Sequence, residues 1–290
     1  MIQITEVDNL EKIYNYQANI HAPYFFSVDF HEWKKSFIDD VDGEGRSLFK
    51  ELCVKAAYEE NELIGFVQYG KTAFGFDNQG EISYDVSYNV IRNLYFNKNK
   101  YDAGYQLFNA AMEAFGATDK VYAFFHYFGM SCFARHGKLY EQHSHVEELI
   151  KQNGFVTEHE NVYYSSILTG DDQSEVEIVP HNLTKGHQQY IDFILSNSQV
   201  GGCEVHYIDH KTTYLRWIYV NEDVVGKGIG TMCMKALKRW LYQKGTTRFD
   251  TDTSISNFVA QHYYEKNGFT REGITRSYYF QFVEYNKVQK

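Results

Sequence analysis

The sequence predicts an α/β (α+β) protein made of two similar units, and three observations support this class. Stretches with strand and helix patterns alternate along the chain, which favours sheets covered by helices. A polar, acidic, glycine-containing segment at residues 169–175 follows the apolar residues 162–168 and is typical of a linker. After it the same alternation recurs in shorter form. We therefore expect two domains, residues 1–168 and residues 175–290.

The elements expected before the linker follow from periodicity. Alternating or β-branched runs predict strands, and apolar residues three and four apart predict helices. The expected strands are 2–7, 52–58, 63–69, 84–96 and 121–128. The expected helices are 10–20, 30–38, a segment with Tyr105, Phe108, Ala111, Met112 and Phe115 on one face, and 146–152.

The second unit repeats this pattern with fewer residues. The expected strands are 176–179, 203–208, 213–220, 248–253 and 274–282. The expected helices are 190–195, 228–242 and 257–266. The signal is strongest for 228–242, where apolar residues recur at i, i+3, i+4, i+7 and i+8 while lysines and an arginine face the other way.

Charge and cysteine content exclude several classes of protein. The 290 residues include 28 Lys and Arg and 38 Asp and Glu, a net charge of −10, which argues against a partner nucleic acid. The N-terminus does not resemble a secretory signal, and no apolar run is long enough to cross a membrane. The cysteines are scattered, so we expect reduced thiols, no bound metal, no membrane association and a cytoplasmic location.

A glycine-rich loop joins the strand at 213–220 to the strongest helix. Gly226, Gly228 and Gly230 allow backbone with positive φ, and the helix start offers free N–H groups, so the loop favours a pyrophosphate. A dinucleotide fingerprint would need a glycine where Thr231 stands, and Lys227 is misplaced for a Walker loop. The loop therefore predicts an anion site of another type.

The helix at 257–266 carries a second signal. Gly268 is typical of the left-handed residue that ends a helix, and Phe269 of the apolar residue that follows it. Ala260 and Tyr264 lie one turn apart on the same face. A small side chain beside a tyrosine leaves room for a thin ligand and provides one hydroxyl.

These two blocks resemble the acyl-CoA-binding motif and the following helix of the GNAT superfamily of N-acetyltransferases. The family loop runs Arg/Gln-x-x-Gly-x-Gly/Ala; Gly228 and Gly230 fit it, while Val225 stands where Arg or Gln is usual. The helix motif fits at Asn257, Ala260, Tyr264, Glu265, Lys266, Gly268 and Phe269. The match is strong over residues 214–280 and faint over 2–168.

The first half resembles a degenerate copy of the second. The paired positions are 95–97 with 219–221, Gly104 with Gly228, and 153–155 with 267–269. This is similar to a tandem GNAT arrangement, which implies two domains, each with a mixed, mostly antiparallel central sheet flanked by helices. The first copy retains only Gly104 of the glycine loop and has Ile150 where Tyr264 stands, so we expect it to be catalytically silent.

The resemblance implies a function. A primary amine of a small molecule or an amino terminus would attack acetyl-CoA directly, with Tyr264 as general acid. A backbone N–H near Val220, freed by a bulge, would stabilise the oxyanion. The implied contacts to the acetyl-CoA cosubstrate are Ile218, Val220, Val225, Gly226, Lys227, Gly228, Ile229, Gly230, Asn257, Ala260 and Tyr264.

Several alternatives stay open. The general base is Glu204, His206, Asp250, Asp252 or a relay of waters, because residues 212–216 contain no carboxylate. The alternative function is a non-enzymatic acyl-CoA-binding sensor or regulatory module, and assembly into a homodimer is left open. Because the second half is short for the family, we expect the first half to supply part of its fold or of the substrate wall. The aromatic segment 21–26 is a candidate for that wall.

Overall fold

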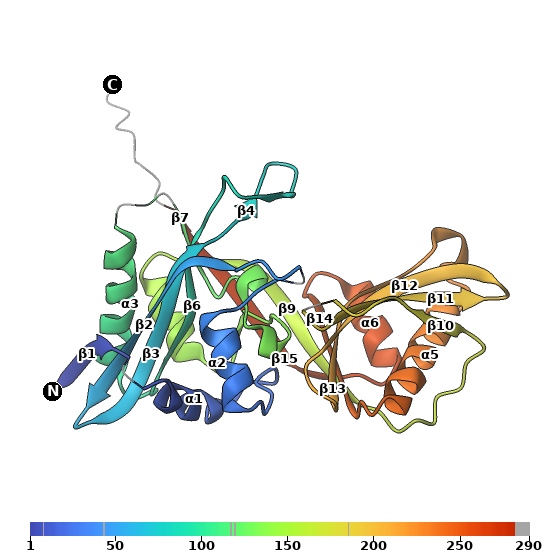
Figure 1. The fold of residues 1–290 in the computed structure, drawn as a ribbon, viewed down its shortest axis with the longest axis horizontal. Coiled ribbons are helices and arrows are strands. Elements are labelled where there is room, and N and C mark those ends of the chain that lie inside the picture. Colours follow the sequence, from blue (N-terminus) through green and yellow to red (C-terminus); the bar gives the residue numbers. More distant parts are fainter. Residues whose placement is uncertain (8, 43, 117, 119, 185, 282–290) are drawn as a thin grey trace.

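A computed structural model describes residues 1–7, 9–42, 44–116, 118, 120–184 and 186–281, and one sheet of 13 strands runs through it (Figure 1). Its strands are β1 (Ile2–Glu6), β2 (Phe49–Glu59), β3 (Glu62–Thr72), β6 (Asn89–Phe96), β7 (Lys120–Ala123), β8 (Leu139–Tyr140), β9 (Val156–Ile167), β10 (Glu177–Pro180), β11 (Gln188–Leu195), β12 (Ser198–Tyr207), β13 (Thr212–Val220), β14 (Arg248–Ser254) and β15 (Thr270–Gln281). The spatial order is β1-β2-β3-β6-β7-β15-β9-β14-β13-β12-β11-β10, with β8 beside β15. The short strands β4 (Gly75–Phe76) and β5 (Ile82–Ser83) form a separate pair.

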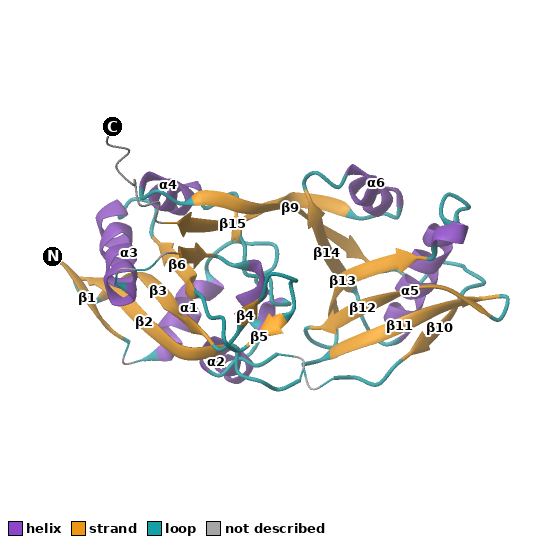
Figure 2. Cartoon of the chain, turned by 90° about the horizontal axis from the view of Figure 1, so that it is seen from above, coloured by secondary structure: helices purple, strands orange, loops and turns teal. Residues whose placement is uncertain are grey.

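The helices gather at the two ends of an elongated molecule. They are α1 (Leu10–Ala18), α2 (Phe30–Ile38), α3 (Tyr101–Phe115), α4 (Ser144–Gln152), α5 (Ile229–Gln243) and α6 (Phe258–Lys266), with short 3-10 turns η1 (His126–Phe128), η2 (Ser131–Phe133) and η3 (Glu222–Val224). α1 to α4 pack at the N-terminal end, while α5 lies behind the layer formed by β10 to β13 (Figure 2). Among the described residues, only two neighbouring pairs of strands, β6 with β7 and β13 with β14, are parallel, so the predicted fold class is confirmed.

Two strands cross between the halves of the chain. β9 precedes the linker, yet its residues 161–167 pair with β14 of the second half. β15 ends the described chain, yet its residues 278–281 pair with β7 of the first half. The hydrogen bonds of the sheet therefore cross the predicted boundary in both directions. The division into 1–168 and 175–290 stays a prediction.

The second half depends on the first for more than a strand. α1 and α2 follow β1, whereas the described residues between β10 and β11 form no helix, in agreement with the shortness noted in the sequence. The N-terminal half covers the sheet face opposite α5, where Tyr163 and Tyr214 stack with ring centroids 6.3 Å apart. The aromatic segment 21–26 also reaches this half, because Arg248 Nη2 donates to the Pro23 carbonyl at 2.6 Å.

Most expected elements are present, and the exceptions have physical causes. Residues 190–195, expected as a helix, belong to β11, because their aromatic and β-branched side chains suit a strand and both neighbours, β10 and β12, offer pairing edges. The long run 84–96 becomes a strand only from Asn89. β7 ends at Ala123, and η1 replaces the rest of the expected strand 121–128. Residue 282 of the final expected strand lies outside the described residues.

Candidate active site

A gap opens between β13 and β14. These parallel strands pair only through residues 212–215 and 248–251, where Thr251 Oγ1 donates to the Leu215 carbonyl at 3.0 Å. The register with β12 shifts beyond Leu215, which leaves Arg216 as an extra, bulged residue. The following residues of β13 therefore have one backbone edge free of strand pairing. Such an edge provides hydrogen-bonding groups for an extended ligand.

The direction of these backbone groups follows from alternation along the strand. The Asn221 N–H donates to the Val200 carbonyl at 2.8 Å, so the backbone N–H of Asn221 faces β12. The groups of Ile218 and Val220 therefore point the other way, into the gap. The sequence predicted a bulge in this strand that frees an N–H near Val220, and the structure places a bulge at Arg216 of the same strand.

The glycine loop forms an open backbone cradle at the start of α5. Gly226 and Gly228 have φ of 78° and 82°, a left-handed conformation in which L side chains are strained. No side chain caps the helix, whose N-cap residue is Gly228. Within the described residues, the N–H groups of Gly226 and of 228–230 have no hydrogen-bond partner. Unpaired donors at a helix N-terminus favour an anion such as a pyrophosphate.

Two of the predicted cradle residues are arranged differently. The Val225 N–H donates to the Glu222 carbonyl at 3.3 Å, and the Lys227 N–H donates to the Val224 carbonyl at 3.4 Å, so both are used within the loop. Lys227 Nζ also donates to the Asp223 carbonyl at 2.7 Å. The ammonium of Lys227 is thus turned onto its own loop.

One cavity of about 470 Å³ unites most of the predicted cosubstrate residues. Nine of the eleven line it: Ile218, Val220, Val225, Gly226, Gly228, Gly230, Asn257, Ala260 and Tyr264. Lys227 and Ile229 do not, and the Ile229 side chain packs against the core of the second half. Sequence reasoning missed Tyr263, which also lines the cavity and donates through its hydroxyl to the Gly230 carbonyl at 2.7 Å.

Asn257 and Tyr264 are positioned by α6. Asn257 Oδ1 accepts from the Ala260 N–H at 3.1 Å, so the side-chain amide of Asn257 caps the helix. Asn257 also lines the cavity. Tyr264 is 5% exposed and its hydroxyl interacts with Thr251, beside the gap. Burial raises the pKa of Tyr264, and the hydrogen bond with Thr251 opposes that rise. The phenol therefore stays protonated near neutral pH, as a general acid must before it reacts.

The two aspartates considered as bases are fully engaged. Asp252 accepts from Lys138 Nζ at 2.8 Å, from Asn161 Nδ2 at 2.6 Å and from the Tyr214 hydroxyl. Burial by itself would raise the pKa of Asp252, but the Lys138 ammonium and the other hydrogen-bond donors hold it well below its usual range. This carboxylate is therefore a poor proton acceptor.

Asp250 is also engaged in hydrogen bonds. It is fully buried and accepts from Tyr163 at 2.9 Å, from Ser165 at 2.8 Å and from Arg248 at 2.8 Å. These contacts join β14 of the second half to β9 of the first half, so Asp250 stabilises the pairing between the two halves. Of the other base candidates, Glu204 pairs with Arg216 at 3.2 Å, and His206 lies on the face opposite α5 beside a second cavity.

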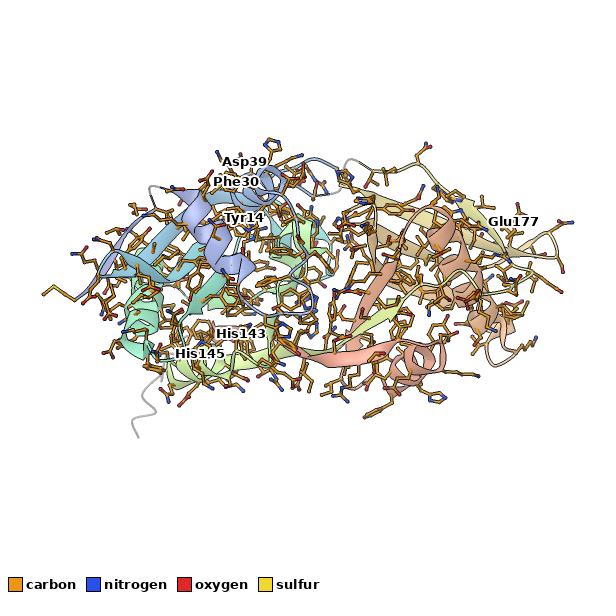
Figure 3. All side chains as sticks on the ribbon, turned by 90° about the horizontal axis from the view of Figure 1, so that it is seen from below. Tyr14, Phe30, Asp39, His143, His145 and Glu177 are labelled. Carbon is orange, nitrogen blue, oxygen red and sulfur yellow. The ribbon has the colours of Figure 1, made fainter. Side chains whose placement is uncertain are left out.

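The corresponding region of the first half is closed. Residues 97–100 alone join β6 to α3, which leaves no glycine loop. Phe96 occupies the position paired with Val220, and its carbonyl contacts His145 Nε2 at 2.9 Å. His145 lies within the N-terminal half (Figure 3). The interpretation of Gly104 as a loop remnant is wrong: it lies inside α3, where an added Cβ would meet the Phe96 ring at 2.4 Å.

Comparison with known proteins agrees with this geometry. Residues 155–269, from just before β9 to just before β15, match the model of the acetyltransferase (GNAT) family. This segment of the chain is a GNAT domain. No curated protein sequence matches it at a significant level. Within the described part of this GNAT protein, no helix is long and apolar enough to cross a membrane, and no group of three or more His, Cys, Asp or Glu side chains is arranged to hold a metal.

Solved structures with the same fold cover both halves of this GNAT chain. A tandem GNAT protein from the clavulanic acid biosynthesis pathway aligns at 7% identity with a TM-score of 0.56, over 97% of this chain and 98% of its own. A GCN5-related N-acetyltransferase from Sphaerobacter thermophilus aligns at 10% identity with a TM-score of 0.59, over 97% and 95%. These identities show the fold alone.

A third match is to part of a larger protein. The GCN5-related glucosamine N-acetyltransferase region of a fungal multi-domain GH3 β-N-acetylglucosaminidase aligns at 11% identity with a TM-score of 0.64. The alignment covers 97% of this chain and 38% of the fungal chain, so the present chain spans well under half of that protein.

Proposed function

We propose that this protein transfers the acetyl group of acetyl-CoA to a primary amine of a small molecule or an amino terminus by direct attack. One observation carries the proposal: residues of the glycine cradle, of the free edge of β13 and Tyr264 all line one cavity of about 470 Å³. That combination suits a ligand with a diphosphate at one end, a thin amide-containing arm and a reactive end beside a proton donor.

Each part of acetyl-CoA has a matching feature. The diphosphate would accept hydrogen bonds from the free N–H groups of Gly226 and of residues 228–230, assisted by the dipole of α5. The amides of the pantetheine arm would pair with the backbone of Ile218 and Val220 as an added strand. Val225 is 62% exposed and its N–H is bonded within the loop, so the free N–H groups of the neighbouring glycines, rather than the usual Arg or Gln, would provide the binding energy there.

The reaction needs two proton transfers. A neutral amine nitrogen attacks the thioester carbonyl carbon, forming the C–N bond, and the C–S bond then breaks to release the thiolate. A free N–H of β13 beyond the bulge stabilises the oxyanion, and Tyr264 gives its proton to the departing sulfur. The proton lost by the amine goes to a base on the acceptor side of the gap.

Two measurements on the full chain test the proposal. Calorimetric titration with CoA measures binding, and thiol release from acetyl-CoA across a panel of amines measures transfer. Tyr264→Phe is expected to lower kcat by about 100- to 10,000-fold while leaving the Kd for CoA nearly unchanged. Tyr105→Phe is the matched control, because Tyr105 is 45% exposed on α3 of the first half.

The outcomes separate the two candidate functions. Binding of CoA without turnover of any amine would favour the sensor or regulatory module. Equal kcat for wild type and Tyr264→Phe across the pH range would remove Tyr264 from the mechanism. Absence of CoA binding at millimolar concentration would overturn the assignment of the glycine cradle.

A further inference from the structure

The acceptor amine must reach the gap from a side that bound acetyl-CoA leaves open. The coenzyme cavity is lined by β13, the glycine loop and α6, so the face of β13 opposite α5 stays accessible. A second cavity, of about 580 Å³, lies where the two halves of the chain meet. None of its lining residues lines the coenzyme cavity, so the acceptor needs a surface nearer to the gap.

Three aromatic rings form such a surface, which we call the aromatic shelf: Tyr190 of β11 and Trp217 and Tyr219 of β13. The ring centroid of Trp217 lies 5.5 Å from that of Tyr190 and 5.9 Å from that of Tyr219. Tyr190 and Trp217 both pair with Glu204 across the sheet, so the rings share one face. Trp217 is 40% exposed and Tyr219 41%, and grouped exposed aromatic side chains are typical of binding surfaces.

The backbone of β12 makes room for the shelf. An added Cβ on Gly202 would meet the Tyr190 hydroxyl at 2.7 Å and the Tyr219 ring at 3.1 Å, so glycine lets both rings lie close to the strand. In the first half, α2 covers the sheet, with the Phe37 ring 6.2 Å from that of Phe66 on β3. The described residues between β10 and β11 form no helix, so the shelf stays uncovered.

The aromatic shelf adjoins the coenzyme site. Tyr219 belongs to the shelf and also lines the coenzyme cavity. Trp217 directly precedes Ile218, whose backbone groups point into the gap and whose side chain packs on the α5 side. By alternation along the strand, the indole lies on the opposite face. An acceptor on Trp217 is therefore one residue away from the backbone that would hold the pantetheine arm.

The polar groups around the shelf are already paired. Arg216 Nε lies 3.2 Å from Glu204, and Asp192 contacts His181 at 2.7 Å and Gln199 at 2.6 Å. The two tyrosine hydroxyls of the shelf bond to each other at 3.1 Å. Among the described residues that border the shelf, these groups are thus not available to a second ammonium group or to sugar hydroxyls. Exposed ring faces instead suit a flat, uncharged aromatic ring.

The engaged carboxylates favour an amine that is uncharged before it binds. Asp250 and Asp252 are fully engaged, Glu204 is paired with Arg216, and His206 lies beside the other cavity. An alkylammonium would need such a base to remove its proton before attack. An amino group bonded directly to an aromatic ring is uncharged at pH 7, because its lone pair is delocalised into the ring.

We propose that the aromatic shelf is the acceptor site and that it takes an arylamine, whose amino group is bonded directly to the ring. The ring stacks on Trp217, and its nitrogen attacks the thioester carbon, forming the C–N bond. The nitrogen becomes positively charged and releases a proton to water on the open face. The C–S bond breaks, and Tyr264 protonates the thiolate. The inference rests on the proposed function, because the shelf acts only if acetyl-CoA occupies the gap.

Thiol release by the full chain with three amines tests the substrate class. Aniline is an arylamine, benzylamine has a ring but a basic amino group, and cyclohexylamine is basic and has no aromatic ring. At pH 7, kcat/KM is expected to be at least about 10-fold higher for aniline than for either basic amine. Between pH 6 and pH 8, kcat/KM should change little for aniline and rise with pH for the two basic amines.

Variants of Trp217 test the shelf itself. Trp217→Ala should raise the KM for aniline about 3- to 10-fold, as expected for one lost ring stack, and leave the Kd for CoA unchanged. Trp217→Phe, which keeps a ring, should restore most of this loss. Tyr105→Ala, at a tyrosine that is 45% exposed on α3, is the control and should leave both constants unchanged.

NMR provides a readout that does not depend on turnover. The chain has three tryptophans, and the indole N–H signal that disappears in Trp217→Phe belongs to Trp217. In wild type with bound CoA, this signal should shift on titration with aniline and stay in place with cyclohexylamine. If Trp217→Ala does not fold, this titration decides.

Three results would overturn the inference while leaving the proposed function intact. The first is CoA binding with equal or better turnover of cyclohexylamine, glucosamine or putrescine than of aniline. The second is an unchanged KM for aniline in folded Trp217→Ala. The third is an indole signal of Trp217 that does not respond to aniline. Failure to bind CoA at all would instead overturn the proposed function, so the two failures are distinguishable.

Discussion

Replacing Gly228 with alanine separates backbone strain from ligand binding. Gly228 has φ of 82°, and an added Cβ would meet nothing within 4 Å, so the substitution creates no clash. The whole cost comes from the left-handed conformation, about 1–2 kcal/mol for an L residue. The same substitution at Gly80, with φ of 83° and equally open surroundings, carries the same intrinsic cost far from the site.

Gly80→Ala should therefore lose about 1–2 kcal/mol of unfolding free energy in urea titrations, whereas Gly228→Ala should lose less, because its open loop can relax in the free protein. Only Gly228→Ala should weaken CoA binding, because relief of the strain rotates the N–H groups that the diphosphate needs. If the strain is relieved in the free protein and restored on binding, CoA binding loses up to about 1–2 kcal/mol of free energy. Calorimetry should then show a Kd that is about 5- to 30-fold higher. Equal CoA affinity for wild type and both alanine variants would refute the cradle.

Two further predictions concern stability. Burial lowers the pKa of His136 and His206 to about 3, so the unfolded chain binds protons that the folded chain refuses between about pH 3 and pH 6.5. The unfolding free energy should thus fall as the solution is acidified through this range, by roughly 1 kcal/mol per pH unit for each histidine. Urea titrations at several pH values measure this dependence, and His206→Asn should make the unfolding free energy depend less steeply on pH. An unchanged pH dependence in His206→Asn would contradict the prediction. A fragment of residues 175–290 should unfold or aggregate, because β14 and β15 both lose their pairing with β9; a monomeric fragment with native circular dichroism and full activity would refute this dependence.

The exchange of β9 and β15 makes the two halves interdependent. Asp250 on β14 binds Tyr163 and Ser165 on β9, and Lys138 of the first half is ion-paired with Asp252 of the second. The buried polar groups along β14 therefore find their partners in the other half of the chain. Without the first half, the second half lacks a neighbouring strand, a covering face and these polar partners.

The cosubstrate side of the site could be predicted from the sequence because its signals are local. The spacing of apolar residues marks α5, the glycines mark positions with positive φ at Gly226 and Gly228, and Gly268 marks the end of α6. These features depend on neighbours within one or two turns of backbone, so the printed order of residues is sufficient to recognise them.

The contacts between the two halves could not be predicted in this way. Arg135 and His206 line one cavity only because segments of the two halves pack together, and no spacing in the chain relates them. The sequence predicts a helix at 190–195, but pairing with β10 and β12 overrides that short, ambiguous pattern. It also predicts a loop at Gly104, but a helix that packs against Phe96 needs glycine as much as a loop does. The sequence alone determined most helices and strands and the glycine loop, since local backbone preferences specify them. The tertiary structure decided the pairing of β9 and β15 across the two halves and the cavity between the halves, since both depend on contacts between residues far apart in the chain.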